Sequence, residues 1–421
     1  MLTFFDFRND IRRLITDLSN YCTIVIFIRR EQEAMVIAHL PSNIAYRIID
    51  ERKKGAYNLF MEKCFLLFRK IPLTRVNYYL MEEFKIGNIE NRKNRRKAHL
   101  LLQLHKMMPH VFSYDRYLHK LKYTGNTNIA DIDTFLCLTE IYDDYLFSRL
   151  IREHKKTFVY VYSWDHACKH TRFSKKVQYM VWNNGIKEDL IQIQRIKEEN
   201  IHISGSTQLG FLSDFNNNNN ITELFSGKPY YYFGCGIGIK KLVEKEIKII
   251  KDLSVVISNL DPDAKLIVRP YPNNKNWSEY DSLLNFTNIV LDNAYRQKDL
   301  SVTEDDIMKK IRTIAGAKAF FHVGTTLGLE TCFTKCPSFI LNTEPDDRKK
   351  VNIYNFVNQY QNKKYLIDQS KSNTITSAHQ LSTVIKNIEK EEYKQLSSII
   401  RSQFPIKPFD KLSKEIHSLL Q

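Results

Sequence analysis

The sequence predicts an α/β protein with two domains, each built on a parallel sheet. Short apolar runs that suit buried strands alternate with amphipathic stretches that suit helices, and this alternation is typical of βαβ units. The chain has 421 residues, which is too long for one ordinary hydrophobic core. The alternation also stops and restarts around a run of five asparagines at 216–220. We interpret this low-complexity segment, which has little to bury, as the boundary between the domains.

The first domain is expected to span residues 1–212. Its strands are predicted at 2–5, 23–28, 44–49, 133–139, 157–163, 177–182 and near 200–204. Helices are predicted at 8–19, up to 39, up to 154 and at 187–199. The loop that contains Asp6 follows the first strand, and so lies at the carboxyl edge of the sheet, where ligands bind in such proteins.

Residues 51–125 interrupt this alternation with a long, basic, helical insertion. The run RKNRRK at 92–97 lies near its centre. Charge runs are usually solvated helix faces. The functional alternative is attraction to an acidic membrane surface or a phosphorylated carrier, since each basic residue near lipid contributes up to about 1 kcal/mol.

The second domain is expected to span residues 221–395. Its strands are predicted at 229–233, 264–272, 288–292, 319–323, 337–341 and 364–368, with helices at 240–260, 304–314 and 351–360. A C-terminal helix within 396–421 follows, for which packing back on the first domain is one option.

The strongest candidate for an anion site is the segment GTT at 324–326. A buried strand that ends in Gly-Thr-Thr and then opens a helix presents backbone N–H groups, hydroxyls and a positive helix end to a phosphate. Glu330 shares a helix face with Thr326 and could accept a hydrogen bond from a sugar hydroxyl. The simpler interpretation is a βα turn with a threonine N-cap.

Composition narrows the classes of partner and compartment. The net charge of +16 favours anions, whether nucleic acid, an anionic membrane or phosphorylated substrates. The seven cysteines are odd in number and scattered, without a C-x-x-C pair, which indicates a reduced cytoplasmic setting. Neither a spanning apolar stretch nor a signal-peptide pattern is present. We therefore expect a cytoplasmic protein, soluble or peripheral at the inner face of the membrane.

Several segments resemble those of bacterial surface-carbohydrate glycosyltransferases. YSWDH at 162–166 resembles their Ser-Trp-Asp-Asn segment, VQYMVW at 177–182 their apolar strand ending in Val-Trp, and NIHISGSTQLGFL at 200–212 the segment after it. KLIVRPYP at 265–272 and AFFHVGTTLGLETCFTKCPSFILN at 319–342 resemble their Arg-Pro-His-Pro and Gly-Ser-Thr…Glu segments. The likeness covers about residues 157–345 and departs from the family at His166, where Asn is usual, and at Tyr271, where His is usual.

This resemblance implies the GT-B architecture: two Rossmann-like domains that face each other across a cleft. The nucleotide-activated donor would be held mainly by the C-terminal domain. The family also includes CDP-glycerol phosphotransferases and capsule transferases. Its pattern implies roles for seven donor-binding residues: phosphate contacts from Gly324, Thr325, Thr326 and Arg269, a hydroxyl from Tyr271, ribose binding by Glu330, and a close passage under the diphosphate for Gly236.

Transfer to a hydroxyl also needs a base on the acceptor side. Asp165, at the end of a predicted strand, is the first candidate, and His166 and Asp6 are rivals. An ordinary helix N-cap is the alternative for Asp165. Trp164 could stack on a sugar or nucleobase or be buried packing. His322, inside an apolar strand, suits a core or supporting role better than ligand contact.

We find no D-x-D pair at a strand end, so we expect transfer without a metal ion and without any other cofactor. The leading hypothesis is a glycosyltransferase that moves a sugar from a nucleotide-sugar donor to a hydroxyl of a surface-glycan acceptor, lipid-linked or polysaccharide, in capsule or lipopolysaccharide biosynthesis. A CDP-glycerol or CDP-ribitol phosphotransferase would use the same fold. A non-catalytic nucleic-acid-binding or anion-binding protein is a more distant alternative, because no nucleic-acid-binding motif is present.

Overall fold

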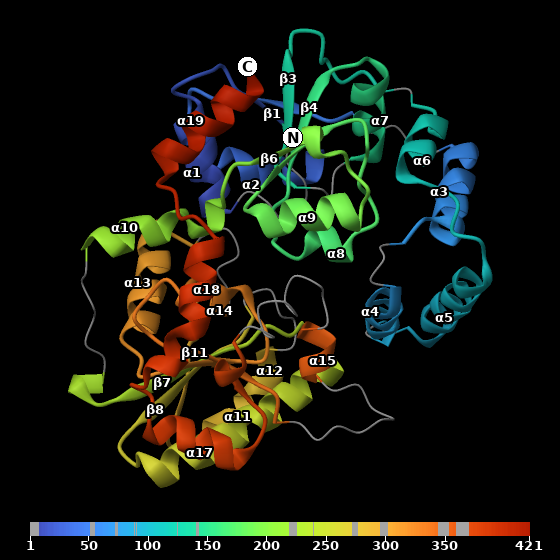
Figure 1. The fold of residues 1–421 in the computed structure, drawn as a ribbon. Helices are drawn as coiled ribbons and strands as arrows, with labels where there is room; N and C mark the ends of the chain where they lie inside the picture. Colours follow the sequence, from blue (N-terminus) through green and yellow to red (C-terminus); the bar gives the residue numbers. More distant parts are fainter. Residues whose placement is uncertain are drawn as a thin grey trace. The chain divides into compact units, whose positions relative to one another are not determined.

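The computed structural model describes residues 8–50, 55–71, 75–87, 89, 91–123, 125–139, 143–218, 225–238, 240–271, 277–294, 302–343, 353–358 and 370–421. The chain forms two compact units (Figure 1). Unit 1 comprises Met1–Gly210 and Pro405–Gln421, and unit 2 comprises Phe211–Phe404. Among the described residues, no helix is both long and apolar enough to cross a lipid bilayer.

Unit 1 contains a four-stranded parallel sheet in the order β3-β4-β5-β6. Its strands are β3 (Thr134–Cys137), β4 (Lys156–Tyr160), β5 (Gln178–Val181) and β6 (Ile201–Ile203). A separate parallel pair joins β1 (Val25–Ile28) to β2 (Ala45–Ile48). The connecting helices are α1 (Asn9–Leu18), α2 (Glu33–Ile37), α7 (Asp144–Arg152), α8 (His166–Lys169) and α9 (Asn184–Gln192). Buried side chains on β4 and β5 explain their nearly unbroken apolar sequences. The predicted first strand at 2–5 lies outside the described residues.

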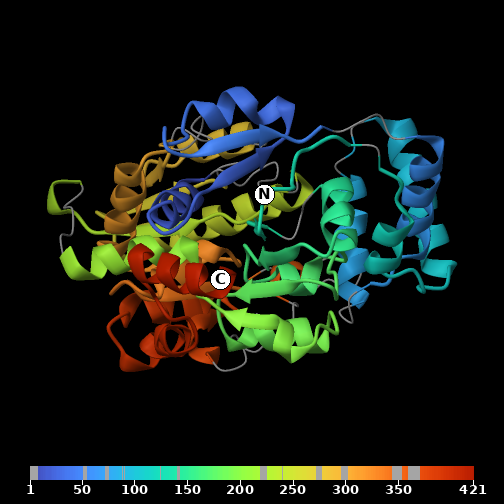
Figure 2. The ribbon, with the colours of Figure 1, turned by 90° about the horizontal axis from the view of Figure 1, so that it is seen from above.

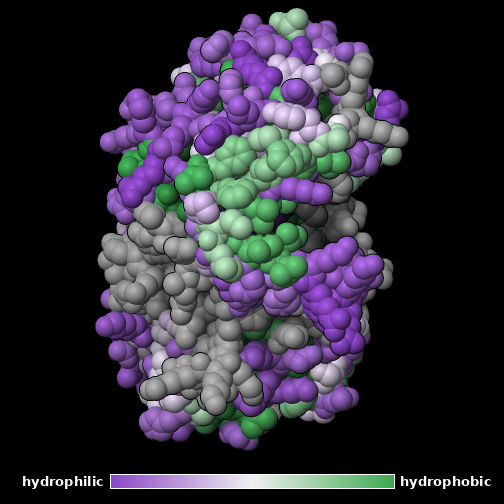
Figure 3. All heavy atoms as spheres, turned by 90° about the vertical axis from the view of Figure 1, so that its right-hand side faces the viewer, coloured by the Kyte–Doolittle hydropathy of each residue, from purple (hydrophilic) through white to green (hydrophobic). Residues whose placement is uncertain are grey.

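Over its described residues, the basic insertion forms four helices, α3 (Ala56–Phe68), α4 (Arg75–Gly87), α5 (Arg92–Met107) and α6 (Tyr114–Lys120). Helix α5 contacts both α3 and α4, and α6 contacts α3 and α7. Phe65 of α3 stacks on Tyr117 of α6 with ring centroids 4.6 Å apart, and this aromatic contact holds α3 against α6 within the insertion. Figure 3 shows the face of the molecule on which these helices lie.

The C-terminal segment contains two helices instead of the single predicted one. Helix α18 (Gln395–Gln403) belongs to unit 2, whereas α19 (Phe409–Leu420) belongs to unit 1 and packs on α1. Figures 1 and 2 show the red α19 beside the blue α1. The ring of Phe409 fills the space over Gly210, where a Cβ atom would lie 2.6 Å from it.

The division between the units comes before the asparagine run. Helix α10 (Gly210–Asn218) continues into that run, because Phe211, Leu212 and Phe215 on the helix are buried. The first asparagines therefore end a packed helix and do not belong to a loop.

Unit 2 is built on a six-stranded sheet in the order β12-β11-β10-β7-β8-β9, and all of its neighbouring strands pair in parallel. The strands are β7 (Tyr230–Gly234), β8 (Lys265–Arg269), β9 (Ile289–Leu291), β10 (Phe320–His322), β11 (Ser338–Leu341) and β12 (Thr374–Ile375). Its helices are α11 (Lys240–Leu260), α12 (Trp277–Tyr280), α13 (Glu304–Ala315), α14 (Thr326–Thr331), α15 (Ile353–Asn358), α17 (Ala378–Lys386) and α18. The predicted strand at 364–368 lies outside the described residues.

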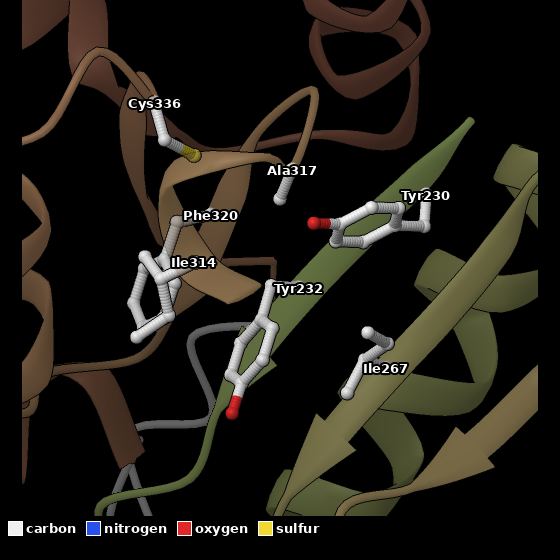
Figure 4. Packing of buried hydrophobic residues seen from close by; sticks show 7 residues of the cluster. All are labelled: Tyr230, Tyr232, Ile267, Ile314, Ala317, Phe320 and Cys336. Atoms are coloured by element: carbon white, nitrogen blue, oxygen red, sulfur yellow. The ribbon is translucent and has the colours of Figure 1, made fainter. Parts of the chain in front are cut away.

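A cluster of buried side chains occupies one face of this sheet (Figure 4). Tyr230 and Tyr232 lie two residues apart on β7 and therefore point to the same face. Tyr232 stacks on Phe320 of β10 with centroids 5.6 Å apart, and Ile267 of β8 completes the cluster across the sheet. The strands β10, β7 and β8 are thus fixed side by side, and the loops that follow them are held at one edge.

Candidate functional site

The two central strands of the unit 2 sheet mark its topological switch point. From β7 the chain proceeds outward through β8 and β9, then returns to β10 on the other side of β7 and proceeds through β11 and β12. In open parallel sheets, ligands bind outside the carboxyl ends of the strands at such a reversal. The segments after β7 and β10 are the Gly234–Gly238 loop and the Gly324–Thr326 turn, both proposed from the sequence to contact phosphate.

These two segments touch each other. A Cβ atom on Gly236 would lie 2.8 Å from the carbonyl oxygen of Gly324 and 3.0 Å from Cβ of Thr325. Backbone atoms cannot move aside as a flexible side chain can, so only glycine fits at residue 236 without a shift of the turn. The structure therefore brings together Gly236, Gly324 and Thr325.

A helix that sequence reasoning did not connect to the turn holds it from one side. Asn358, at the end of α15, donates a hydrogen bond to the carbonyl oxygen of Val323 at 2.7 Å. A Cβ atom on Gly324 would lie 2.5 Å from Val357 and 2.8 Å from the Asn358 side-chain oxygen. The turn thus has no space for a side chain at Gly324.

His322 supports the turn from within the sheet. It is buried at the end of β10, and its Nδ1 accepts a hydrogen bond from the Thr325 backbone N–H at 3.3 Å. The ring packs against Gly328, where a Cβ atom would lie 2.4 Å from Nε2. This geometry agrees with the supporting role expected for His322, because its hydrogen bond fixes the backbone of Thr325.

Glu246 of α11 anchors the loop after β7. Its carboxylate is fully buried, accepts a hydrogen bond from the Gly236 N–H at 3.1 Å, and accepts another from the Tyr280 hydroxyl at 2.7 Å. Burial raises the pKa of Glu246 to about 7, although both of these hydrogen bonds lower it. Sequence reasoning missed Glu246, yet a signal was present: it lies at helical spacing between the buried residues Val243 and Ile250.

Arg269, the last residue of β8, lies beside the start of this loop. It pairs with Gly234 in the register between β8 and β7, and the Cys235 N–H donates to its carbonyl oxygen at 3.0 Å. Its guanidinium is buried and forms an ion pair with Asp292 at 3.3 Å, and Asp292 also accepts a hydrogen bond from Tyr232 at 2.8 Å. Arg269 is therefore held in place by an acidic partner that sequence reasoning did not identify.

The remaining donor-side candidates are less concentrated. Thr325, and not Thr326, is the N-cap of α14, since its hydroxyl accepts a hydrogen bond from the Leu327 N–H at 3.4 Å. The carboxylate of Glu330 forms an ion pair at 2.6 Å with Lys310 of α13. Tyr271 follows β8 with 42% of its surface exposed. Helix α14 has only 6 residues, so its dipole is weaker than the sequence suggested.

The acceptor-side candidates in unit 1 follow β4. Trp164 and Asp165 are buried, whereas His166 is partly exposed. Asp165 occupies the N-cap position of α8 but makes no capping hydrogen bond; it accepts one from Ser163 at 2.9 Å. Asp6 lies outside the described residues.

Sequence reasoning also missed Asp10 in unit 1. This buried carboxylate at the start of α1 accepts hydrogen bonds from Thr207 at 2.7 Å and from Tyr162 at 3.3 Å. Thr207 in turn donates its backbone N–H to Tyr160 at 2.8 Å. The chain places this acidic network beside the end of β4, close in sequence to Trp164. The available signal was its position in the first turn of the predicted helix 8–19, close after the loop that contains Asp6.

Nothing in the described part of the chain groups three or more His, Cys, Asp or Glu side chains in a way that could hold a metal ion. All seven cysteines are free thiols.

Comparison with known proteins supports the architecture. No family model matches the chain, and no curated protein is similar to it in sequence. Solved structures do match. Staphylococcus aureus MnaA in complex with UDP has a TM-score of 0.50 at 11% identity, over 97% of this chain and 91% of that one.

Two further matches have lower scores. WaaG, a glycosyltransferase involved in lipopolysaccharide biosynthesis, has a TM-score of 0.41 at 10% identity, over 100% of this chain and 97% of that one. UDP-GlcNAc 2-epimerase from Neisseria meningitidis, bound to UDP-GlcNAc, has a TM-score of 0.43 at 10% identity, over 94% and 98%. Identities this low establish a common fold and nothing finer. With two parallel α/β units and this likeness, the predicted fold class is confirmed: the chain has the GT-B fold, composed of two Rossmann-like units.

Proposed function

We propose that this protein is a glycosyltransferase that uses a nucleotide-activated sugar as donor and a hydroxyl of a surface glycan as acceptor. The acceptor is a lipid-linked or polysaccharide chain of the capsule or lipopolysaccharide type. The observation that carries the proposal is the contact between Gly236 and the Gly324–Thr325 turn at the switch point of unit 2.

Three observations support binding of the donor phosphates at the contact between the Gly236 loop and the Gly324–Thr326 turn. The loop and the turn meet outside the carboxyl ends of β7 and β10 at the switch point of the sheet, which is where parallel α/β sheets bind phosphates. Glu246 fixes the loop and His322 fixes the turn, which reduces the ordering cost of binding. Arg269 lies at the same sheet edge, where its charge favours an anion. MnaA, which shares the fold, was solved with UDP.

Tyr271, Thr326 and Glu330 complete the proposed donor contacts. Tyr271 offers an exposed hydroxyl, and Thr326 begins α14 beside the turn. Glu330 would bind the ribose, with Lys310 holding its carboxylate in place. No metal is required in this proposal.

Acceptor activation is assigned to the segment after β4. Asp165 would take the proton from the acceptor hydroxyl, with His166 as the rival base and Trp164 as a stacking surface. Asp6 remains a rival from the loop before α1. The hydrogen bond from Ser163 orients the Asp165 carboxylate. The protein would act in the cytoplasm at the inner face of the membrane.

A nucleotide panel tests the donor assignment without knowledge of the acceptor. Thermal unfolding is measured with UDP, GDP, CMP and CDP, and we expect one nucleotide to raise the Tm more than the others. Activated donors of the same class are then offered, and the released nucleotide is scored. Release of CMP from CDP-glycerol or CDP-ribitol would identify a polyol phosphotransferase instead, and conversion of a UDP-sugar to its epimer without an acceptor would identify an epimerase. Absence of any nucleotide-dependent shift would refute the proposal.

A glycine pair provides a matched control for the site. Gly236→Ala places a Cβ atom 2.8 Å from the Gly324 carbonyl, whereas a Cβ atom on Gly238 meets nothing within 4 Å. We expect Gly236→Ala to weaken nucleotide binding at least tenfold, by about 1.4 kcal/mol or more, and Gly238→Ala to leave it unchanged. Equal nucleotide binding by the two variants would contradict the placement of the donor at this contact.

A further inference from the structure

Exposed apolar side chains are concentrated on the helical insertion of unit 1. In the described part of the chain, eight of the fifteen large hydrophobic residues that are exposed fall between residues 57 and 111. Two of the largest exposed fractions are those of Met107 at 81% and Phe60 at 62%. Figure 3 shows hydrophobic surface gathered into a patch on this face, with hydrophilic surface along part of its border. Clustering of this kind indicates an interaction site, whereas isolated exposed hydrophobic residues do not.

Helix α5 combines this apolar surface with positive charge. Lys93, Leu100 and Met107 are spaced seven residues apart and therefore lie on one side of the helix. All three are exposed, whereas Leu102 and His105 face inward and are buried. The outward side of α5 is thus basic in its first half and apolar in its second half, over a length of about 21 Å from Lys93 to Met107.

Helix α3 extends the apolar part. Leu59, Phe60 and Leu66 are exposed, whereas Phe65 on the opposite side is buried. Helix α3 contacts α5, and Figure 3 shows hydrophobic surface gathered on the face where these helices lie, so we treat their outward sides as one surface. We refer to this surface as the docking face; its residues are Leu59, Phe60, Leu66, Lys93, Arg96, Lys97, Leu100 and Met107.

The basic residues do not stabilise the helix that carries them. The first turns of α5 contain Arg92, Lys93, Arg95, Arg96 and Lys97, and its sequence contains no acidic residue. Positive charges at a helix N-terminus are unfavourable because the helix dipole is positive there. Asn91 provides the N-cap through a hydrogen bond from the Asn94 N–H at 3.1 Å. An external anionic partner would offset this unfavourable placement.

We propose that the docking face binds the surface of an anionic lipid bilayer, with Leu100, Met107 and Phe60 inserted among the lipids and the basic half of α5 on the head groups. An interfacial helix with cationic and apolar sides binds membranes in this way without spanning them. A nucleic acid would satisfy the charges but leave the apolar side chains exposed. A second copy of the chain would bring two basic runs together, and their repulsion opposes such a dimer.

This inference deepens the proposed function and rests on it for one point only, the use of the membrane to reach a lipid-linked acceptor. Lipid binding itself is measured without donor or turnover. If the protein binds vesicles but processes no nucleotide-sugar, the docking face is supported and the proposed function is refuted. If it processes a nucleotide-sugar but binds no vesicles, the proposed function is supported and the docking face is refuted.

Vesicle sedimentation with the full chain tests the proposal. Neutral vesicles of phosphatidylcholine are compared with anionic vesicles that contain about 30% phosphatidylglycerol. The anionic vesicles carry the negative surface charge that attracts basic protein segments to membranes. We expect binding to the anionic vesicles only, weakened by salt. The triple variant Lys93→Gln, Arg96→Gln, Lys97→Gln should bind about 100-fold more weakly, since each charge contributes roughly fivefold. The double variant Leu100→Ser, Met107→Ser should lose at least tenfold.

Matched controls lie outside the docking face. Leu284→Ser removes an exposed leucine of unit 2, and the triple change Lys248→Gln, Lys411→Gln, Lys414→Gln removes three exposed lysines. Both should bind vesicles like the wild type. Equal binding by wild type and docking-face variants would overturn the proposal, as would equal binding to neutral and anionic vesicles.

Two measurements keep the result interpretable. Leu100→Trp replaces a side chain that is 62% exposed and should fold normally; its fluorescence should shift to the blue with anionic vesicles. Sedimentation velocity without lipid tests for a dimer. A dimer that is lost in Leu100→Ser, Met107→Ser, together with no shift for Leu100→Trp on vesicles, would assign the face to self-association and overturn the lipid proposal.

Discussion

Replacement of Glu246 by glutamine should change how the stability of the protein depends on pH. The carboxylate is fully buried, and burial raises its pKa to about 7, against 4.5 for an ordinary glutamate. The native state therefore holds the proton more tightly than the unfolded state does. The stabilisation is complete below pH 4.5, decreases as the pH rises towards about 7, and is lost above it.

The size of the effect follows from the shift in pKa. Each pKa unit corresponds to about 1.4 kcal/mol, so the wild-type free energy of unfolding should fall by about 3 kcal/mol between pH 4.5 and pH 8 through this group alone. Glu246→Gln carries no titratable group, yet its amide oxygen can still accept the Gly236 N–H. The variant should therefore match the wild type at low pH and exceed its stability by about 3 kcal/mol at pH 8.

Urea denaturation at half-unit steps from pH 4.5 to pH 8 measures this difference. Glu244→Gln on the same helix is the control, because Glu244 is exposed and its replacement should leave the pH profile unchanged. A difference between Glu246→Gln and wild type that stays constant across the pH range would refute the argument that Glu246 is neutralised in the folded protein.

The other predictions concern the remaining site residues. Arg269→Ala should lower nucleotide affinity, measured by calorimetry, and also stability, measured by urea denaturation, because Asp292 loses its ion-pair partner at 3.3 Å. Addition of Asp292→Asn to this variant should restore stability but not affinity. His322→Ala should destabilise the fold by about 1 to 3 kcal/mol and weaken nucleotide binding, since the Thr325 N–H loses its acceptor; unchanged affinity would disconnect that turn from the donor. Asp165→Asn should lower kcat with donor affinity kept, and the kinetics of donor turnover decide whether Asp165 or another residue is the base.

Much of the fold could be predicted from local pattern. The helix predicted at 240–260 matches α11 (Lys240–Leu260), because its long amphipathic pattern is unambiguous. The helix predicted at 187–199 was wrong at both ends: α9 (Asn184–Gln192) begins at the Asn183 cap, whose side chain accepts from the Ile186 N–H at 3.0 Å, and ends well before a separate short turn at 198–200. Element boundaries depend on caps and tertiary contacts that the apolar pattern does not contain.

The candidate site was harder to predict in full. The glycine loop and the Gly-Thr-Thr turn could be recognised from their own sequences. Their contact with each other could not, because it depends on β10 being placed beside β7 and not beside β9. The partners Asp292, Lys310 and Asn358 come from distant segments, so no spacing in the sequence connects them to Arg269, Glu330 or Val323.

The C-terminal helix α19 makes unit 1 discontinuous in sequence, whereas unit 2 is one uninterrupted segment, Phe211–Phe404. A gene fragment that encodes this segment contains every strand of its sheet and can be expressed alone. A fragment that stops at residue 210 lacks the helix that covers α1 and should be poorly soluble unless α19 is supplied by a linker or in trans. Isolation of unit 2 for crystallisation is therefore simpler than isolation of unit 1.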